Sequence, residues 1–149
     1  MYVSISSGLL LSGGFSSIAE GLQALGIDTI ELGINREYQV LSVKPTADKP
    51  NFVLTSDSAV NEYKKHLEQN NVKISAIIMG NNFNAPDLEA ELNWVIRTIQ
   101  IADMLNIKTV RIDAIMSGER DMPLNERQSH FADCMKKVLD AANSSNVAP

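Results

Sequence analysis

Short apolar runs alternate along the chain with longer stretches in which apolar residues recur every three or four positions. Each short run is rich in β-branched residues and is bounded by Gly, Asn or Ser, which is the pattern of a β-strand. The strands predicted in this way cover Tyr2–Ser7, Thr29–Gly33, Lys73–Gly80 and Thr109–Ala114. Strands that alternate with helices of this length form parallel sheets with right-handed crossovers, so the sequence predicts a parallel α/β fold.

The longer stretches predict four helices, one after each strand. Ser17 followed by Glu20 is a capping-box pattern at the start of the first helix, and Gly26 ends that helix after the inward-facing Leu25. The other three helices are expected from about 58 to 69, from 86 to 105 and from about 123 onward. The last helix is predicted to bury Phe131, Met135, Val138 and Leu139.

The pattern within the strands distinguishes two architectures. A doubly wound sheet has helices on both faces, so its central strands are apolar at every position. Here Ile30 and Leu32 alternate with Glu31, and Arg111 and Asp113 alternate with apolar neighbours in the fourth strand. This alternation favours a barrel with its helices outside and a polar pocket at the carboxyl ends of the strands. We therefore expect strand order 1-2-3-4 with the helices on the convex face, and the alternative is a flavodoxin-like sheet of order 2-1-3-4.

Composition and charge narrow the possible functions. The 149 residues carry a net charge of −5. Such a chain lacks the basic face of a nucleic-acid-binding protein, and no apolar run reaches the roughly 18 residues that span a membrane. The single cysteine, Cys134, excludes an internal disulfide framework. We expect one cytoplasmic domain over residues 1–149, with neither nucleic acid nor a membrane as a partner.

Three segments resemble one family of barrels. Gly26–Leu32, Ala102–Ile107 and Thr109–Asp113 are similar to the xylose isomerase-like TIM barrels. That superfamily includes sugar and sugar-phosphate isomerases and epimerases, together with endonuclease IV-type enzymes. The resemblance extends over nearly the whole chain but includes only the first four βα units. It implies a parallel (βα)4 portion of a TIM (β/α)8 barrel, with the second half absent.

The resemblance also implies a metal-dependent reaction in the complete barrel. Enzymes of this group hold a divalent cation (manganese, magnesium, cobalt or zinc) at the mouth. In the sugar isomerases the Glu, Asp, His and Glu ligands come from the last four strands. We therefore expect no metal site and no independent isomerase activity in residues 1–149. The endonuclease interpretation is disfavoured because no histidine follows the third or fourth predicted strand.

Four polar residues near strand ends are the candidate substrate-binding residues: Glu31, Asn81, Arg111 and Asp113. Residues at the carboxyl ends of barrel strands usually face the site. Glu31 could accept a hydrogen bond from a substrate hydroxyl, or it could pair with Arg111. The guanidinium of Arg111 suits a phosphate or carboxylate, although an internal network with Asp113 is equally compatible with its position. Asn81 can donate to and accept from sugar hydroxyls, and Asn is also common in turns.

Two connections and two histidines are assigned less specific roles. The connection Asn35–Asp57 is long enough to cover the mouth, and the charged segment Ser117–Asp121 is expected to be a solvated loop. His66 and His130 lie on predicted helices with no other metal ligands at suitable spacing, which indicates surface or packing positions.

Two functions are compatible with these observations. The first is the N-terminal half of a metal-dependent sugar or sugar-phosphate isomerase or epimerase, supplying scaffold and one wall of a carbohydrate pocket. The second is a self-contained α/β binding or interaction module without catalysis. A half-barrel leaves two unpaired strand edges, so we also expect self-association or pairing with a C-terminal half-barrel.

Overall fold

The computed structural model describes residues 3–114, 122–143 and 147, so the segment Ser117–Asp121 lies outside the described residues. The described helices are α1 (Ser7–Ser12), α2 (Ile18–Leu25), α3 (Asp57–Gln69), α4 (Leu88–Met104) and α5 (Leu124–Ala142). The described strands are β1 (Ile5–Ser6), β2 (Thr29–Gly33), β3 (Gln39–Leu41), β4 (Asn51–Val53), β5 (Lys73–Ile78) and β6 (Val110–Arg111).

Strands β1, β2, β5 and β6 form one parallel sheet in that order. In the register of this sheet, Leu32 of β2 lies beside Ile77 of β5, and Ile77 lies beside Val110 of β6. Each strand therefore pairs with the preceding strand of the sheet, and the predicted order 1-2-3-4 is confirmed. The flavodoxin-like alternative is wrong, because it requires β1 between β2 and β5.

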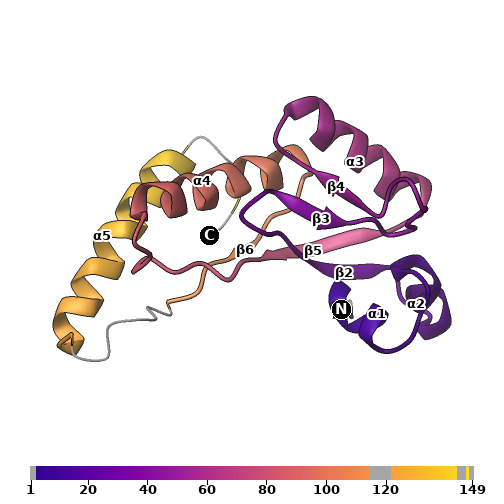
Figure 1. The fold of residues 1–149 in the computed structure, drawn as a ribbon, viewed down its shortest axis with the longest axis horizontal. Coiled ribbons are helices and arrows are strands. Elements are labelled where there is room, and N and C mark those ends of the chain that lie inside the picture. The colour runs from indigo at the N-terminus through magenta and orange to yellow at the C-terminus, as the bar shows by residue number, and fades with distance from the viewer. Residues whose placement is uncertain (1–2, 115–121, 144–146, 148–149) are drawn as a thin grey trace.

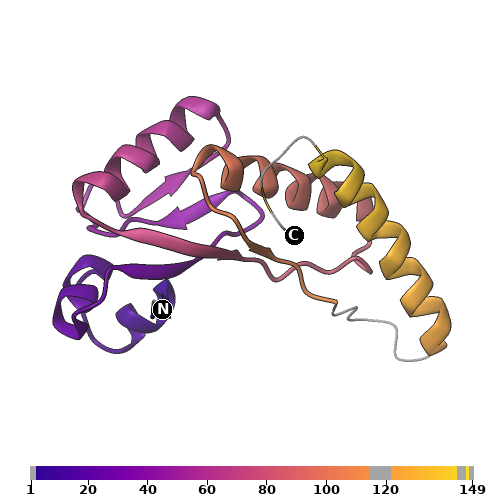
Figure 2. The same ribbon diagram turned by 180° about the vertical axis from the view of Figure 1, so that it is seen from behind.

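The helices and the sheet are arranged as in Figure 1, where α1 and α2 lie below β2 and α3 and α4 lie above β5. Helix α5 packs against α4 at the end of the molecule far from α2 and α3, as both ribbon views show (Figures 1 and 2). The short antiparallel hairpin of β3 and β4 lies next to α3.

The two faces of the parallel sheet differ in polarity. One face carries apolar side chains that are at most 1% exposed: Ile30, Leu32, Ile77 and Val110. On the opposite face Glu31 and Ile78 are half-buried and Arg111 is exposed. These four side chains belong to the hydrophobic core. Burial of each one contributes about 1.5–3 kcal/mol to the stability of the fold. The alternation read from the sequence is thus the alternation of the folded sheet.

The helix boundaries follow the predicted capping signals. The Oγ atom of Ser17 accepts a hydrogen bond from the backbone N–H of Glu20, at 3.1 Å. Gly26 ends α2 in the left-handed conformation with φ of 68°, which a residue without Cβ adopts at little cost. Asp87 caps α4 by accepting from the N–H of Ala90 at 3.0 Å. These local interactions place α2 and α4 within one or two residues of their predicted positions.

Two expectations for loop and strand segments are corrected. The first strand is only Ile5–Ser6, and the following residues form α1, in which Leu10 is 1% exposed because it packs beneath α2. The connection Asn35–Asp57 was expected to be a loop but contains β3 and β4. Val40 and Phe52 are opposite each other in this hairpin and are both buried. Strands of three residues are too short to show a two-residue period in the sequence.

Two side chains expected in the core lie at the surface instead. Leu25 is 50% exposed and Leu139 is 47% exposed. Val138 is buried as predicted, and Leu22 is buried as well. Leu25 is the last residue of α2, and the buried residues of this helix lie at Ile18, Gly21 and Leu22. Leu139 lies on the side of α5 that no described element covers.

Candidate functional site

Asn81 joins the ends of β5 and β6. Its side chain is almost completely buried, at 3% exposure. The Nδ2 atom of Asn81 donates to the carbonyl oxygen of Asp113 at 3.0 Å, and the backbone N–H of Asp113 donates to Oδ1 of Asn81 at 2.7 Å. Both ends of the side-chain amide are therefore committed to one peptide segment, which fixes the position of Asp113.

Asp113 in turn forms an ion pair with Arg111. The Nε atom of Arg111 lies 3.2 Å from Oδ1 of Asp113, and the two side chains are 57% and 24% exposed. An ion pair at this exposure contributes little to stability, about 0–1 kcal/mol. The remaining nitrogens of the guanidinium have no hydrogen bond or ion pair with the described residues and are open to a ligand. The Arg111–Asp113 pair presents donors and an acceptor side by side at the carboxyl end of β6.

Glu31 lies on the same face of the sheet as Arg111. In the register Glu31 is beside Ala76 of β5, and Arg111 is beside Ile78 two positions further along that strand. The pairing of Glu31 with Arg111 that the sequence allowed is not formed, since the guanidinium contacts Asp113 instead. Among the described residues no hydrogen bond or ion pair engages the half-buried Glu31 carboxylate. This carboxylate is therefore available to accept hydrogen bonds.

The structure brings three of the four predicted residues into direct contact and leaves the fourth nearby on the same face. Asn81, Arg111 and Asp113 form one connected cluster, whereas Glu31 is separate from it. The available groups are a carboxylate at Glu31, guanidinium donors at Arg111 and the second carboxylate oxygen of Asp113. Such a set can bind hydroxyl groups by donating and accepting hydrogen bonds.

A second polar cluster, which sequence analysis missed, lies immediately behind the loop Gly80–Asn82. Arg36 donates to both carboxylate oxygens of Glu91, from Nε at 2.8 Å and from Nη2 at 2.7 Å. The guanidinium also lies 4.6 Å from the centroid of the Trp94 ring. The hydrogen bonds to Glu91 raise the pKa of Arg36 above its ordinary value.

The sequence held one signal for this pair. Glu91 falls on the apolar stripe of α4, beside Leu88 and Leu92, and it is 3% exposed. A charged residue at a buried helix position needs a partner, because an unpaired buried charge is very costly. The partner, Arg36, is 55 positions away in the chain, so only the folded structure identifies it.

The described residues do not form a divalent metal centre. Within residues 3–114, 122–143 and 147, no three His, Cys, Asp or Glu side chains converge on one point. Glu31 and Asp113 are the carboxylates on the candidate face, and Asp113 is occupied by Arg111. A hard cation such as magnesium requires several oxygen ligands, and these two do not suffice.

Both histidines have packing roles. The Nε2 atom of His66 lies 3.0 Å from Oγ of Ser42, and its ring packs against Phe52 with centroids 4.9 Å apart. Burial lowers the pKa of His66, and the nearby Lys49 lowers it further while Glu62 opposes this effect. His130 contacts the carbonyl oxygen of Phe83 through Nε2 at 2.7 Å. His66 is thus bound to the hairpin of β3 and β4, whereas His130 contacts the segment that follows Asn81.

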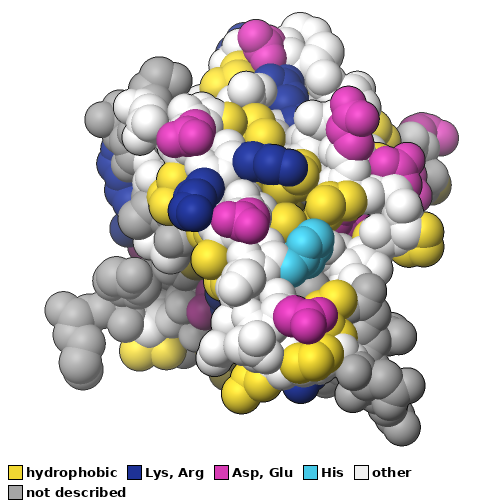
Figure 3. Space-filling view, turned by 90° about the vertical axis from the view of Figure 1, so that its left-hand side faces the viewer, with side chains coloured by type: hydrophobic (Ala, Val, Ile, Leu, Met, Phe, Trp, Pro, Cys, Tyr) yellow, Lys and Arg dark blue, Asp and Glu magenta, His cyan; other side chains and the backbone are white. Residues whose placement is uncertain are grey.

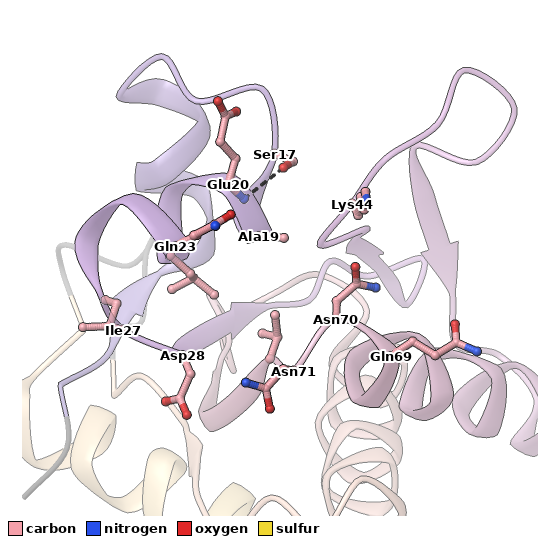
Figure 4. Close-up of a pocket in the computed structure, with 12 residues that line it drawn as sticks. Ser17, Ala19, Glu20, Gln23, Ile27, Asp28, Lys44, Gln69, Asn70 and Asn71 are labelled. Carbon is pink, nitrogen blue, oxygen red and sulfur yellow. Dashed lines mark hydrogen bonds between the residues drawn. The ribbon is translucent and has the colours of Figure 1, made fainter.

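A cavity of about 550 Å³ lies at the opposite end of the sheet (Figure 4). Its walls include Asp28 and Val72, which directly precede β2 and β5, and side chains from the ends of α2 and α3. In Figure 4 Glu20, Gln23, Lys44 and Asn70 surround an open hollow between α2 and α3. In parallel barrels the amino ends of the strands serve stability, whereas function lies at the carboxyl ends. This cavity is therefore not the candidate site.

None of the helices in the described residues combines the length and the apolar character required to cross a bilayer.

The chain superposes on solved structures of the same fold and spans about half of their length. L-ribulose 3-epimerase superposes with a TM-score of 0.62 and 18% identity, covering 99% of this chain and 48% of the epimerase. A xylose isomerase domain protein from Planctomyces limnophilus gives a TM-score of 0.61 with 10% identity, covering 97% and 51%. A xylose isomerase-like TIM barrel protein from Mycobacterium smegmatis, solved in complex with magnesium, gives 0.59 with 17% identity, covering 98% and 52%. At such low identities these superpositions show a shared fold and nothing further.

The family is established by a separate comparison. No curated protein matches the chain. The family model of the xylose isomerase-like TIM barrel matches residues 20–148, which is most of the chain and includes both clusters described above. The parallel order β1-β2-β5-β6 is the order of consecutive units in such a barrel. The chain therefore belongs to the xylose isomerase-like TIM barrel family.

Proposed function

We propose that this chain forms the N-terminal half of a metal-dependent sugar or sugar-phosphate isomerase or epimerase and supplies one wall of its substrate pocket. The observation that carries the proposal is the polar, partly exposed face of the parallel sheet, on which Glu31, Arg111 and Asp113 lie near the carboxyl ends of their strands. Solved neighbours of the same fold include a D-psicose 3-epimerase and an L-ribulose 3-epimerase, which supports a sugar substrate.

Each residue of the wall has a distinct proposed role. The free carboxylate of Glu31 accepts from a substrate hydroxyl, and the outward nitrogens of Arg111 donate to a hydroxyl or a phosphate oxygen. Asp113 orients Arg111 and offers its remaining oxygen to the substrate. Asn81 acts on the site by holding Asp113, because its amide donates to and accepts from the backbone of that residue. All four are proposed as binding or positioning residues.

The metal of the reaction requires ligands from outside the described residues. A divalent cation would polarise the substrate oxygens during isomerisation or epimerisation. A neighbour of the same fold was solved with magnesium, which supports a divalent cation in the family. Because Glu31 and Asp113 alone do not fit a hard cation, we propose that the chain on its own is inactive. The acidic charge and the single cysteine support a cytoplasmic location.

We further propose that the open side of the sheet pairs with a C-terminal half-barrel or, without one, with a second copy of the chain. Strands β1 and β6 each have only one neighbour in the described sheet, and unpaired strand edges favour association. Figure 3 shows apolar side chains among charges of both signs at the end of the molecule that includes α5. Two of the exposed apolar residues, Leu124 and Leu139, belong to α5.

Binding of D-fructose, followed by amide NMR of the chain, tests the sugar proposal. We expect shifts that saturate and are concentrated at Glu31, Arg111 and Asp113, and that are lost in Glu31→Gln and Arg111→Lys. The control is Lys44→Ala at the opposite cavity, which should leave the shifts unchanged. Shifts confined to the cavity around Lys44, or no shifts at any concentration, would contradict the proposal.

Calorimetric titration with manganese, combined with light scattering, tests the metal and partner proposals. We expect no tight manganese binding and a mass above that of one chain. Micromolar manganese binding by a stable monomer would contradict the half-barrel proposal and support a self-contained module.

A further inference from the structure

The Arg36–Glu91 ion pair is built around the loop Gly80–Asn82, which follows β5. Besides its two bonds to Glu91, Nη2 of Arg36 donates to the carbonyl oxygen of Gly80 at 3.1 Å. The same Oε1 of Glu91 that receives Nη2 of Arg36 also accepts from the backbone N–H of Asn82 at 2.5 Å. The two peptide groups held in this way are on either side of Asn81.

The pair is rigid enough to fix this loop. Glu91 is 3% exposed and lies in the first turn of α4, a helix of 17 residues. The guanidinium is restrained on a second side by the ring of Trp94, which is also 3% exposed. A bidentate arginine–carboxylate pair fixes direction as well as distance, because both groups are planar. The loop is thus attached to the body of α4 by charged hydrogen bonds.

A continuous set of contacts runs from this pair to the candidate site. It passes from Glu91 to the peptide group of Asn82, through Asn81 to the backbone of Asp113, and from the carboxylate of Asp113 to Arg111. Every step is a hydrogen bond, an ion pair or a covalent bond. The two peptide groups held by the pair are thus those that carry the Asn81 side chain to Asp113.

We propose that Arg36 and Glu91 are positioning residues for the candidate site: they hold the loop Gly80–Asn82 so that Asn81 keeps Asp113 and Arg111 in place. The role of this site in sugar binding rests on the proposed function, whereas the positioning itself is a statement about the folded chain. The pair is buried only on the Glu91 side, since the Arg36 side chain is 52% exposed, and an ion pair open to solvent contributes little to stability. The bonds of this pair to the peptide groups beside Asn81 indicate that its role is to position the loop.

Amide hydrogen exchange at Asp113 reports this positioning directly, because that N–H is bonded to Oδ1 of Asn81. Glu91→Gln removes the charge while keeping the shape. We expect exchange at Asp113 to accelerate by about tenfold or more, as for loss of a local protecting interaction, with no change at Leu32 in the sheet. The matched control is Glu89→Gln, two positions away in the same turn of α4 but exposed, which should leave Asp113 unchanged.

A double variant separates positioning from stability. Arg36→Met combined with Glu91→Leu replaces the pair by apolar side chains, and because a pair with a 52% exposed Arg36 contributes little to stability, we expect a urea midpoint close to that of the unsubstituted chain. Exchange at Asp113 should nevertheless remain fast in this variant, because the bond from Arg36 to the Gly80 carbonyl and the bond from the Asn82 N–H to Glu91 are both removed.

Two results would overturn the proposal. One is exchange at Asp113 that is the same in Glu91→Gln and Glu89→Gln. The other is acceleration at Asp113 that is matched by all core amides, which would mean that the pair only stabilises the whole fold. Titration with D-fructose in the unsubstituted chain is read separately: if it shows no binding, the proposed function fails while the exchange data still decide the positioning.

Discussion

The side-chain amide of Asn81 faces the backbone of Asp113 as one peptide group faces another in a β-sheet. It donates to the Asp113 carbonyl at 3.0 Å and accepts from the Asp113 N–H at 2.7 Å. Backbone pairing between the two chain segments extends to the N–H of Met79 and the carbonyl of Arg111. Asn81 therefore continues the pairing of β5 with β6 after the two backbones begin to separate.

Removal of this amide should destabilise the fold. In Asn81→Ala the N–H and C=O groups of Asp113 lose their partner in a partly buried place, at a cost of about 1–3 kcal/mol. Urea unfolding followed by circular dichroism measures the change. Asn93→Ala, at an exposed position of α4, should lie within about 0.5 kcal/mol of the unsubstituted chain. Equal effects of the two substitutions would show that the Asn81 contacts contribute no stability.

The alternation of β2 predicts opposite outcomes for two consecutive residues. Leu32 is fully buried in the core, so Leu32→Ala should reduce the free energy of unfolding by about 2–5 kcal/mol. Glu31 is half-buried on the other face with no partner among the described residues, so Glu31→Gln should change it by less than about 0.5 kcal/mol. The measurement is again urea unfolding. A large loss for Glu31→Gln would mean that its carboxylate has a structural partner.

The end of α2 gives a test of backbone conformation. Gly26 has a φ of 68°, and a Cβ atom there would meet no neighbour within 4 Å. Any loss in Gly26→Ala thus comes from the left-handed conformation alone, and we expect about 1–2 kcal/mol in thermal or urea unfolding. Gly33→Ala, at a position with open space and without a left-handed φ, is the control and should be nearly neutral. Tolerance of alanine at position 26 would contradict the helix end described here.

Stability should depend on pH through His66. Its pKa in the folded chain is below the ordinary value of 6.5, chiefly because of burial and secondly because of Lys49. The unfolded chain therefore takes up the proton first, so stability is complete above pH 6.5 and falls as the pH is lowered toward the folded pKa. Below that pKa both states carry the proton and this contribution stops changing.

The variant His66→Gln isolates this contribution. The difference in urea midpoint between the variant and the unsubstituted chain should vary with pH only in the window just below 6.5. A difference that is the same at every pH would show that His66 titrates alike in both states.

The fold was predictable from the sequence wherever local signals were long enough. The alternation around Ile30 and Leu32 and the caps at Ser17 and Gly26 placed β2 and α2 correctly. The hairpin of β3 and β4 was not predictable, because each strand buries a single residue near its centre and carries no periodic signal. Helix α1 was missed for a related reason, since its six residues gain their stability from packing on α2.

The candidate site was predictable in its residue types but not in its connections. Position near the strand ends identified Glu31, Asn81, Arg111 and Asp113. The binding role of these four residues stays a prediction. Sequence spacing could not show that both polar atoms of Asn81 are used by Asp113. It also could not show that Arg36 reaches Glu91, because that contact depends on how the loop after β2 meets the start of α4.

The strand order of the sheet has a consequence for how the chain folds during synthesis. Since β2 pairs with β1, β5 with β2 and β6 with β5, each strand after β1 finds a partner among residues that have already left the ribosome. Chains emerge at about 5–20 residues per second, slowly compared with local folding events. The sheet can therefore grow one unit at a time from the N-terminus, and at each stage the newest strand is the exposed edge to which the next is added.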